Sequence, residues 1–406
     1  MSKRRKIAVL SPSHPPLGEG GITSAHFNLA GSLRAAGHRV KTFTFYDVAF
    51  FHNSGEVIRG GVPSLAKRFT HRAANLFLRL KGERGYLYQF AHDLTGALGG
   101  LLLLPAIRAF KPDIIIVPDR GAPSAFWPSM PNSKILFLSH HNPMRFINNP
   151  LIGSLSEEDA RYAVKVENLA LKRSHAVVCP SRYMKDVFSQ TYPFSGIVNV
   201  IPNVADEGFI LSMPPVDIKS KLDLPPEAPV IYIPSASSLV KGKLFVFEIV
   251  RRIALLFQKQ IGFYLSGIID DDLHYLLSHI PENARIYAPG HLSYADIIAV
   301  VKGCDLCISP TVLENFGMAL LEAVFCGLPV VSFDIGGNRE LIQDGATGFL
   351  APFPDVGALI EKSLSLLNDG GMRASFSKES EDFSLSTFSS DKVLRAYERL
   401  FQRLES

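Results

Sequence analysis

Short apolar runs alternate with longer amphipathic stretches along the whole chain. The first run, 6–11, precedes a helical stretch at 22–36, and a second run follows at 40–45. Apolar runs of about 4–8 residues are typical of buried strands, and apolar residues at every third or fourth position are typical of helices. Further strands are predicted at 114–118, 135–139, 176–180, 198–202, 230–234, 262–266, 284–288, 306–310 and 329–333. Strands that alternate with helices predict an α/β fold with doubly wound parallel sheets.

The length of the chain favours two such domains. Of its 406 residues, 47% are hydrophobic, which is enough for two buried cores. Residues 206–229 are polar and rich in proline, a composition typical of a linker. We therefore predict a first domain at 1–205, a linker at 206–229, a second domain at 230–386 and a C-terminal amphipathic helix at 387–406.

Charge and cysteine usage narrow the class of protein. The net charge of +4 is too small to indicate a nucleic-acid partner. All four cysteines lie in apolar segments, and Cys304 and Cys307 are expected to be core thiols because no second pair or histidine stands at metal-ligand spacing. The longest apolar run, 97–107, is about half a membrane span. We expect a cytoplasmic protein with no signal peptide and no membrane-spanning helix, soluble or peripheral to the membrane.

The stretch 310–322, PTVLENFGMALLE, carries the main candidate chemistry. It follows a predicted strand, and the apolar residues after Phe316 predict a buried helix that ends at Gly327. The free N–H groups at the start of a helix attract phosphates, and Gly317 leaves room for a ligand near the backbone. The predicted phosphate-binding backbone belongs to Phe316, Gly317, Met318 and Ala319.

Two glutamates flank these backbone donors. Glu314 precedes them, and Glu322 lies about 12 Å further along if the intervening residues are helical. Carboxylates on both sides of an anion site fit a ligand with hydroxyls at each end and phosphates between, as in a nucleotide-sugar. Two ordinary helix glutamates, one of them favoured by the helix dipole, explain the spacing equally well.

A glycine-rich loop follows the first predicted strand. Gly18, Gly20 and Gly21 let the backbone approach a ligand at the carboxyl end of this strand. Thr23 stands where a dinucleotide-binding loop has its third glycine, and the Lys-Ser/Thr pair of a Walker loop is missing. By themselves the glycines indicate a flexible turn more than a binding site.

The region 59–84 is basic and amphipathic. Its only acid is Glu83. The cations are Arg59, Lys67, Arg68, Arg72, Arg79, Lys81 and Arg84, and the interleaved apolar residues include Leu65, Phe69, Leu76, Phe77 and Leu80. This pattern suits a helix on an anionic membrane surface, and it also suits a solvated helix, which is the interpretation we favour.

A resemblance to a known family favours the nucleotide-sugar site over the alternative of two ordinary helix glutamates. Residues 310–350 read PTVLENFGMALLEAVFCGLPVVSFDIGGNRELIQDGATGFL. They resemble the signature of the retaining nucleotide-sugar glycosyltransferases of family four, which have the GT-B fold of two Rossmann-like domains facing each other across a cleft. The matching residues are Pro310, Thr311, Glu314, Phe316, Gly317, Glu322, Gly327, Pro329, Val330, Val331, Gly336, Gly337, Glu340, Asp344, Gly345, Thr347, Gly348, Phe349 and Leu350.

The resemblance implies a role for each candidate residue in a bound donor. Glu314 would accept hydrogen bonds from the sugar hydroxyls, and Glu322 would hold the ribose. Lys241 and the backbone donors would stabilise the diphosphate as charge develops on it. Gly20 and Gly21 would approach the donor phosphates. The histidine of the family stands beside the sugar and corresponds to His141, with His140 as the alternative, and the C-terminal helix would cross back to the first domain.

The sequence departs from the family at one cation. Family members carry an arginine just after the first strand of the second domain, where this chain has Ser235 or Ala236. The loss of a cation beside the diphosphate predicts that Lys243 substitutes, that the enzyme is slow, or that it is inactive. Separately, Asp270–Asp272 contain a metal-binding DxD pattern of another glycosyltransferase fold, but helix capping explains these residues without a metal.

The combined prediction is a retaining, hexosyltransferase-type glycosyltransferase with a nucleotide-sugar donor. The acceptor would be a glycan, a lipid-linked molecule or a small molecule, and neither a metal nor a cofactor is expected. The membrane contact of region 59–84 stays open. The alternatives are a nucleotide-sugar epimerase and a non-catalytic protein that binds nucleotide-sugars.

Overall fold

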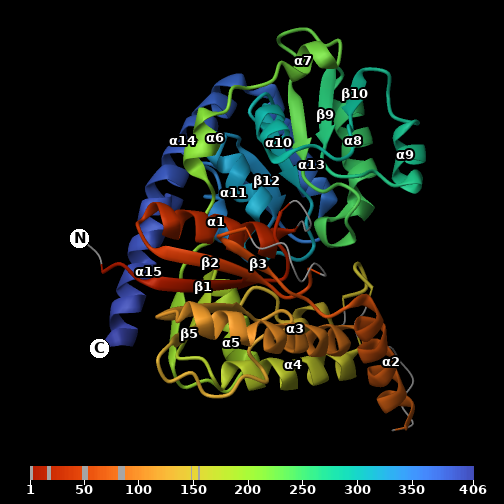
Figure 1. Ribbon diagram of the computed structural model, residues 1–406. Coiled ribbons are helices and arrows are strands. Elements are labelled where there is room, and N and C mark those ends of the chain that lie inside the picture. The colour runs from red at the N-terminus through yellow and green to blue at the C-terminus, as the bar shows by residue number, and fades with distance from the viewer. Residues whose placement is uncertain (1–2, 16–19, 48–53, 81–86, 148, 154–155) are drawn as a thin grey trace. The chain divides into compact units, whose positions relative to one another are not determined.

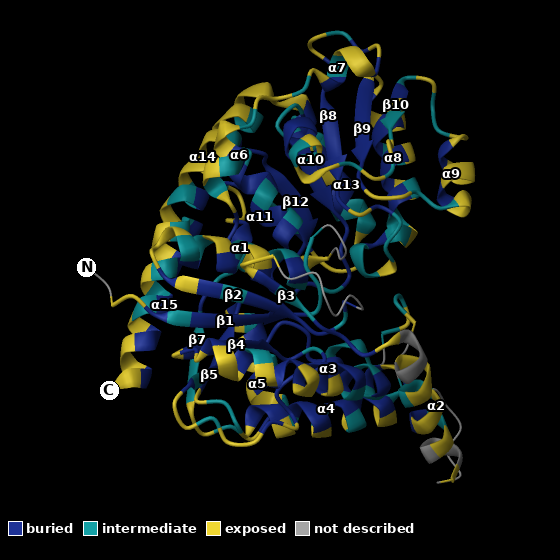
Figure 2. Ribbon diagram, viewed as in Figure 1, coloured by how far each residue is buried: buried dark blue, intermediate teal, exposed yellow. Residues whose placement is uncertain are grey.

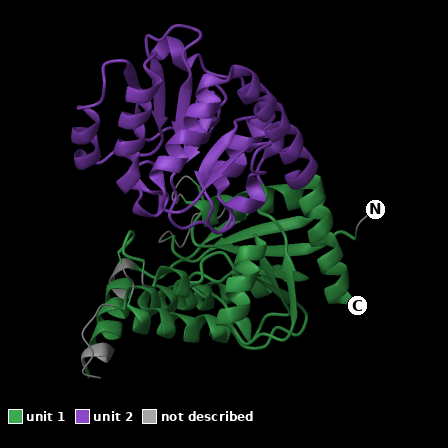
Figure 3. Ribbon diagram, turned by 180° about the vertical axis from the view of Figure 1, so that it is seen from behind, with its two compact units in different colours: residues 1–204, 390–406 green, residues 205–389 purple. Residues whose placement is uncertain are grey.

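The computed structural model describes residues 3–15, 20–47, 54–80, 87–147, 149–153 and 156–406, and it describes the side chains of the helix at 64–80 for 67–76 and 80. Gly18, Lys81, Glu83 and Arg84, named above, lie outside the described residues. The chain forms two compact units, one of residues 1–204 with 390–406 and one of residues 205–389 (Figure 3).

Unit 1 is built on a seven-stranded parallel sheet with the order β3-β2-β1-β4-β5-β6-β7 (Figure 1). The interior strand β1 pairs with β2 and β4, so that Val9 stands opposite Thr42 and Ile116. The strands are β1 (Lys6–Ser11), β2 (Arg39–Thr44), β3 (Val57–Arg59), β4 (Ile114–Pro118), β5 (Lys134–Leu138), β6 (Ala176–Cys179) and β7 (Ile197–Val200). The strand order reverses between β1 and β4, and parallel α/β sheets bind ligands at the carboxyl ends of such strands.

Helices cover both faces of this sheet because successive strand residues point to opposite sides. Ile7 and Val9 face a core with α1 and α15, whereas Ala8 and Leu10 face a core with α3, α4 and α5. The buried faces of these elements are dark blue in Figure 2. The helices of unit 1 are α1 (Gly21–Ala35), α2 (Ser64–Leu80), α3 (Tyr88–Phe110), η1 (Pro143–Phe146), α4 (Glu157–Leu171), α5 (Arg182–Thr191) and α15 (Ser390–Glu405).

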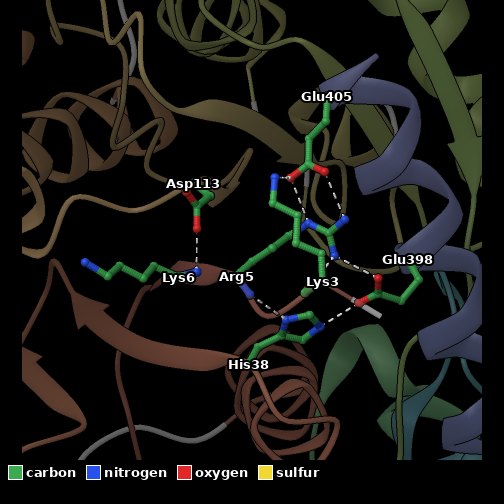
Figure 4. A network of polar contacts seen from close by, with 7 residues as sticks. All are labelled: Lys3, Arg5, Lys6, His38, Asp113, Glu398 and Glu405. Atoms are coloured by element: carbon green, nitrogen blue, oxygen red, sulfur yellow. Dashed lines mark hydrogen bonds and ion pairs between the residues drawn. The ribbon is translucent and has the colours of Figure 1, made fainter. Parts of the chain in front are cut away.

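A buried arginine ties the C-terminal helix α15 to the first strand of unit 1. Arg5 is only 1% exposed, and it donates hydrogen bonds to Glu398 at 2.8 Å and to Glu405 at 2.9 and 3.1 Å (Figure 4). The His38 ring lies 2.5 Å from the second oxygen of Glu398. Two carboxylates therefore satisfy one buried guanidinium, which is the condition for burying a charge.

Unit 2 has a six-stranded parallel sheet with the order β10-β9-β8-β11-β12-β13. Its strand order reverses between β8 and β11. The strands are β8 (Val230–Ile233), β9 (Ile261–Leu265), β10 (Ala284–Tyr287), β11 (Leu306–Ser309), β12 (Val330–Phe333) and β13 (Gly348–Ala351). Helices α8 and α13 share a hydrophobic core with these strands. The helices of unit 2 are α6 (Glu207–Ser212), α7 (Ile218–Lys221), η2 (Leu239–Lys241), α8 (Lys243–Phe257), α9 (Asp271–Leu277), α10 (Tyr294–Val301), α11 (Met318–Phe325), α12 (Asn338–Leu341), α13 (Val356–Asn368) and α14 (Gly370–Phe388).

The two parallel sheets confirm the predicted α/β fold class. The sequence analysis did not predict β3 and β13, which are edge strands of 3 and 4 residues. Residues 206–229, for which we expected a linker, contain α6 and α7 and belong to unit 2.

Candidate functional site

An ion pair lies at the strand-order reversal of unit 2. Lys241 ends the turn η2 that follows β8, and Glu314 lies in the loop between β11 and α11. The Lys241 Nζ atom is 2.5 Å from Glu314 Oε2. The Lys241 side chain is 31% exposed and that of Glu314 only 10%, so the lysine reaches solvent while the carboxylate is largely covered. This arrangement places one cation and one acceptor where parallel sheets bind ligands.

Backbone contacts hold the Lys241 and Glu314 loops together. Thr311 Oγ1 and Val312 N each donate a hydrogen bond of 3.0 Å to Val240 O. Gly242 has φ +86°, and a Cβ atom there would lie 1.9 Å from the carbonyl oxygen of Pro310. Only glycine fits this contact, because the left-handed conformation and the missing space both exclude a side chain.

The start of helix α11 leaves its N–H groups free of side-chain caps. Its N-cap residue is Gly317, and no side chain caps the helix. The first N–H groups of a helix have no partner within the helix and carry its positive dipole end, so they attract anions. A Cβ atom on Gly317 would lie 3.1 Å from Glu314 Oε2. The glycine therefore keeps the space between the carboxylate and the helix start open.

The residues that supply the predicted backbone donors differ in how far their side chains are buried. The ring of Phe316 is 3% exposed and packs against Phe388 with 5.6 Å between ring centroids. Met318 is also buried, whereas Ala319 is partly exposed. Only the backbone of Phe316 and Met318 is therefore suited to bind a ligand, in agreement with a phosphate site made of N–H groups.

Glu322 occupies a different environment in the second turn of α11. It is partly buried, and the ion pairs of the described residues do not include it. The Tyr294 hydroxyl hydrogen-bonds its carboxyl, and burial raises the pKa of Glu322 to about 7. Tyr294 in turn stacks on Phe209, with ring centroids 5.5 Å apart. A carboxyl without a cation keeps acceptor capacity for the hydroxyls of a ligand.

Sequence reasoning missed Tyr294. It lies 28 positions before Glu322, at the start of α10, and nothing in its own segment indicates a functional role. The packing of α6 against α11 brings Phe209 and Tyr294 to this place. Only the tertiary structure shows this contact.

The structure also shows the surroundings of Lys243 and Ser235, the residues considered in connection with the missing family arginine. Lys243, the suggested substitute, is 2.5 Å from Asp270 and is therefore already paired. Asp270 caps α9 by accepting the N–H of Leu273 at 3.1 Å, which accounts for this aspartate. Ser235 adopts φ +50°, and its N–H donates to Ser266 Oγ at 3.0 Å.

The carboxyl edge of the unit 1 sheet holds the predicted histidine. His141 follows β5 and is 7% exposed, and its ring stacks on Phe146 with centroids 4.9 Å apart. Its backbone N–H donates to Asp119 Oδ2 at 2.7 Å. Burial, reinforced by the nearby charges of Arg120 and Arg145, lowers the pKa of His141 well below its usual value. The ring is therefore neutral at pH 7 and can exchange hydrogen bonds with uncharged hydroxyls.

The alternative histidine, His140, has structural partners. Its Nε2 atom lies 2.8 Å from Asn203 Oδ1, and its ring is 5.3 Å from the buried ring of His26. This environment distinguishes it from His141 and favours His141 as the ligand-facing residue.

The two glycines of the first loop lie at the start of α1. Gly20 has φ +126°, which a residue with a side chain rarely adopts, and α1 lacks a side-chain cap. A Cβ atom on Gly20 or Gly21 would meet nothing within 4 Å. The candidate residues therefore form two sets, with Gly20, Gly21 and His141 in unit 1 and the others in unit 2.

Two family models match the chain over most of its length. Glycosyltransferase Family 4 matches residues 19–209, and Glycosyl transferases group 1 matches residues 218–383. Each unit is thus covered by one model, in agreement with the resemblance found in the sequence.

The curated relatives match shorter segments. An uncharacterized glycosyltransferase of Methanocaldococcus jannaschii is 29% identical over 149 residues, 36% of this chain and 42% of the relative. The N-acetyl-alpha-D-glucosaminyl L-malate synthase of Bacillus anthracis is 31% identical over 97 residues, 24% of this chain and 26% of the relative. The D-inositol 3-phosphate glycosyltransferase of Mycobacterium sp. (strain KMS) is 34% identical over 100 residues, 25% and 23% of the two chains. The chain spans less than half the length of these relatives.

Solved structures resemble the whole chain. Sucrose-phosphate synthase from Thermosynechococcus elongatus has a TM-score of 0.73 at 17% identity and covers 99% of both chains. Anabaena HepE in complex with UDP has a TM-score of 0.71 at 20% identity, with 98% of this chain and all of that chain covered. At these identities the likeness shows the fold, and it confirms the predicted GT-B fold.

Proposed function

Because the chain belongs to the group 1 and family 4 glycosyltransferases, we propose that it transfers a sugar from a nucleotide-diphosphate sugar to an acceptor hydroxyl, with retention and without a metal ion. The observation that carries this proposal is the Lys241–Glu314 pair beside the uncapped start of α11. A cation, bare N–H groups and a carboxylate supply the contacts that a diphosphate and a sugar need. Two structural neighbours support the donor class, since Anabaena HepE was solved with UDP-glucose and with UDP, and the catalytic domain of starch synthase IV of Arabidopsis thaliana with ADP.

In this proposal the unit 2 site stabilises the leaving diphosphate. Negative charge grows on the diphosphate as its bond to the sugar breaks, and preorganised donors lower the energy of that state. Lys241 has three N–H donors, so it can contact a phosphate oxygen and retain Glu314. The N–H groups of Phe316, Gly317, Met318 and Ala319 complete the set.

The carboxylates orient the two ends of the donor. Glu314 accepts hydrogen bonds from the sugar hydroxyls, and Glu322 accepts those of the ribose. For His141 in unit 1 we propose a hydrogen bond to a sugar hydroxyl, for which its neutral ring is suited. No side chain acts as nucleophile, and the leaving phosphate oxygen takes the acceptor proton on the same face of the sugar.

One observation favours a second candidate function, the binding of a nucleotide-sugar without transfer. The family arginine is replaced by Ser235 or Ala236, and Lys243 is occupied by Asp270. Among the described residues of unit 2, Lys241 is then the one lysine or arginine that forms an ion pair with Glu314. Loss of a diphosphate contact reduces transfer more than binding, because the charge is largest in the transition state.

A two-stage experiment tests both candidates. A thermal-shift screen with UDP-, GDP- and ADP-sugars identifies the donor, because a ligand that binds only the folded state raises the melting temperature. Nucleotide release from that donor is then measured with and without candidate acceptors. Release that depends on an acceptor supports the transferase. Binding without release on any acceptor supports the non-catalytic function, and the absence of any shift contradicts both.

The sequence alone favours a solvated helix at 59–84, but the exposed apolar side chains of α2 lead us to propose that the protein is cytoplasmic and contacts an anionic membrane surface through this helix. Phe69 and Leu80 on this helix are 72% and 78% exposed, and Lys67, Arg68 and Arg72 are exposed beside them. Apolar side chains beside cations are the composition of helices that lie in the membrane interface. Within the described residues, only α3 is long and apolar enough to cross a membrane, and more than half of that window is buried, as in core helices.

Vesicle sedimentation tests the membrane contact. The wild type is expected to sediment with vesicles that contain phosphatidylserine and much less with neutral vesicles, since each cation near an anionic surface contributes about 1 kcal/mol. Phe69→Ser combined with Leu80→Ser should abolish the sedimentation. Equal sedimentation of this double variant would show that α2 is a solvated helix.

A further inference from the structure

Two arginines at the carboxyl edge of the unit 1 sheet form no ion pair with an acid among the described residues. Arg120 stands two residues after β4, and Arg145 lies in η1 after β5. The ion pairs of the described residues include neither of them, in contrast to Arg59, which pairs with Asp47 at 3.2 Å. Arg120 Nε and Arg145 Nη2 are buried and have no hydrogen-bond partner in the described part of the chain. Two guanidinium groups at this edge thus keep unsatisfied donors.

Both arginines interact with the surroundings of the same residue, His141, through hydrogen bonds or through their charge. Arg145 donates from Nη1 to the carbonyl oxygen of His141 at 3.2 Å, and its guanidinium lies over the rings of Phe146 and Tyr183 at 5.8 and 5.5 Å. On the Arg120 side, the carboxylate of Asp119 accepts the backbone N–H of Arg120 at 2.7 Å and that of His141 at 2.7 Å. Both positive charges act on the His141 ring and lower its pKa.

The acids near this place are engaged by backbone groups. Asp119 accepts three backbone N–H groups, those of Arg120, His141 and Asn142. Asp93 accepts the N–H of Gly121 at 2.8 Å, and it is 2% exposed. Burial raises the pKa of both carboxyls, and these backbone hydrogen bonds and, for Asp93, the charge of Arg120 oppose that shift.

A third cation extends the positive region. Lys67 of α2 is exposed, and its Nζ atom lies 5.5 Å from the centre of the Tyr46 ring. The Tyr46 hydroxyl is 2.6 Å from the His92 ring, whose pKa is lowered to about 3, mainly by burial and further by the charges of Arg120 and Lys67. The carboxyl edge therefore combines imidazoles of lowered pKa with cations that form no ion pair among the residues the structure describes.

We propose that Arg120 and Arg145 form an anion subsite that binds a phosphate or carboxylate group of the acceptor. A guanidinium presents a planar fork of N–H donors that matches both anions, and such buried donors cost free energy while they lack a partner. The assignment to the acceptor rests on the proposed function, in which Lys241 and the start of α11 in unit 2 stabilise the donor diphosphate and His141 contacts the donor sugar. The acceptor would then be an acidic molecule with a free hydroxyl, not a neutral glycan.

The subsite can be tested with free anions on the full-length chain. We would titrate inorganic phosphate and, separately, acetate into a Lys241→Ala variant, which lacks the cation of the unit 2 site. The readout is the histidine NMR spectrum of ¹⁵N-labelled protein, with His141 assigned by His141→Gln. An anion between the two arginines should shift the His141 signal in a saturable manner and raise its pKa, since it offsets the positive charges. A response to phosphate only, or to acetate only, would identify the acidic group that the subsite prefers.

Matched variants separate binding from misfolding. Arg120→Gln and Arg145→Gln, each made in the Lys241→Ala background, should lose the shift, Arg145→Lys should retain part of it, and Arg161→Gln is the control, since Arg161 is exposed and pairs with Glu157 on α4. Thermal unfolding shows whether each variant is folded. The proposal would be overturned if the His141 signal does not respond to either anion. It would also be overturned if the shift remains in both the Arg120→Gln and the Arg145→Gln variant. Donor binding, measured with Lys241 intact, is independent, so its failure would refute the proposed function and leave the anion subsite standing.

Discussion

Two groups of glutamates in this molecule differ in how completely their partners use their hydrogen-bonding capacity. In unit 1, Glu398 and Glu405 of α15 both contact the buried guanidinium of Arg5 (Figure 4). In unit 2, Glu314 has a single lysine that reaches solvent, and Glu322 has a tyrosine hydroxyl but no cation among its described neighbours. The first group is saturated, and the second retains hydrogen-bonding capacity.

The difference separates a structural role from a functional role. A saturated buried network contributes to stability and has no donor or acceptor left for a ligand. An unsaturated group costs stability and persists where a ligand completes it. Variants in the Arg5 network should therefore change unfolding and leave donor binding unchanged, and variants in the unit 2 site should do the reverse.

The largest effect is expected at Lys241. Lys241→Ala should lower kcat for transfer by about 100- to 1000-fold, because the variant loses a cation where charge develops on the diphosphate. Nucleotide release under saturating donor measures this. Lys243→Ala is the control, since Lys243 pairs with Asp270 and should matter little. Equal losses in both variants would remove the special role of Lys241.

The next effect concerns Arg5. Arg5→Met should lower the free energy of unfolding by about 2–4 kcal/mol, since a buried charge network loses its centre. Denaturant unfolding measures the change, and the affinity for the donor should stay at the wild-type value. The Arg5 guanidinium lowers the pKa of Glu405, so this stabilisation is present at neutral pH and is lost as the pH falls through that lowered pKa. An unchanged stability at pH 7 would contradict the saturated network.

A variant of Glu322 should gain stability and lose donor affinity, in contrast to Arg5→Met. Burial raises its pKa to about 7, so the folded state binds more protons than the unfolded state and stability falls as the pH rises toward 7. Glu322→Gln should therefore be more stable than the wild type by about 1–3 kcal/mol at pH 8 and similar at pH 4. The same variant should bind the donor about 10-fold more weakly at pH 8, since an ionised acceptor of ribose hydroxyls is lost.

The control for this prediction is Glu379→Gln on the exposed side of α14. Isothermal titration and denaturant unfolding at both pH values give the two readouts. If Glu322→Gln binds the donor as well as the wild type does, the assignment of Glu322 to the ribose is wrong.

The smallest effect is expected at Tyr294, which acts through Glu322. Tyr294→Phe should weaken donor binding by about 3- to 10-fold, because one hydrogen bond to the carboxyl is lost. Since that hydrogen bond lowers the pKa of Glu322, the pH below which donor affinity falls should move upward. A purely structural role would change the affinity at every pH equally, so the pH profile decides between the two interpretations.

Much of the fold follows from local patterns in the sequence. The alternation of apolar runs and helical stretches predicts the parallel sheets, because a strand buried on both faces needs a continuous apolar run. The segment around Glu314 combines a strand, a glycine and a helix start, so its anion-binding capacity can be predicted from neighbours in the chain. The edge strand β3 was missed because 3 residues carry little pattern. The edge strand β13 was also missed, although strands of the same length, such as β8, were predicted.

Only the tertiary structure decided which partners the charged groups have. Arg5 and Glu398 are 393 positions apart, and Lys241 and Glu314 are 73 apart. The pairing of Lys243 with Asp270 and the contact of Tyr294 with Glu322 likewise depend on packing between distant elements. So does the fact that Arg120 Nε and Arg145 Nη2 find no partner among the described residues. The sequence determined which groups can carry charge and where chain segments turn or pair. Whether a charge is satisfied depends on atoms that folding brings within about 3 Å, and no local pattern encodes that distance.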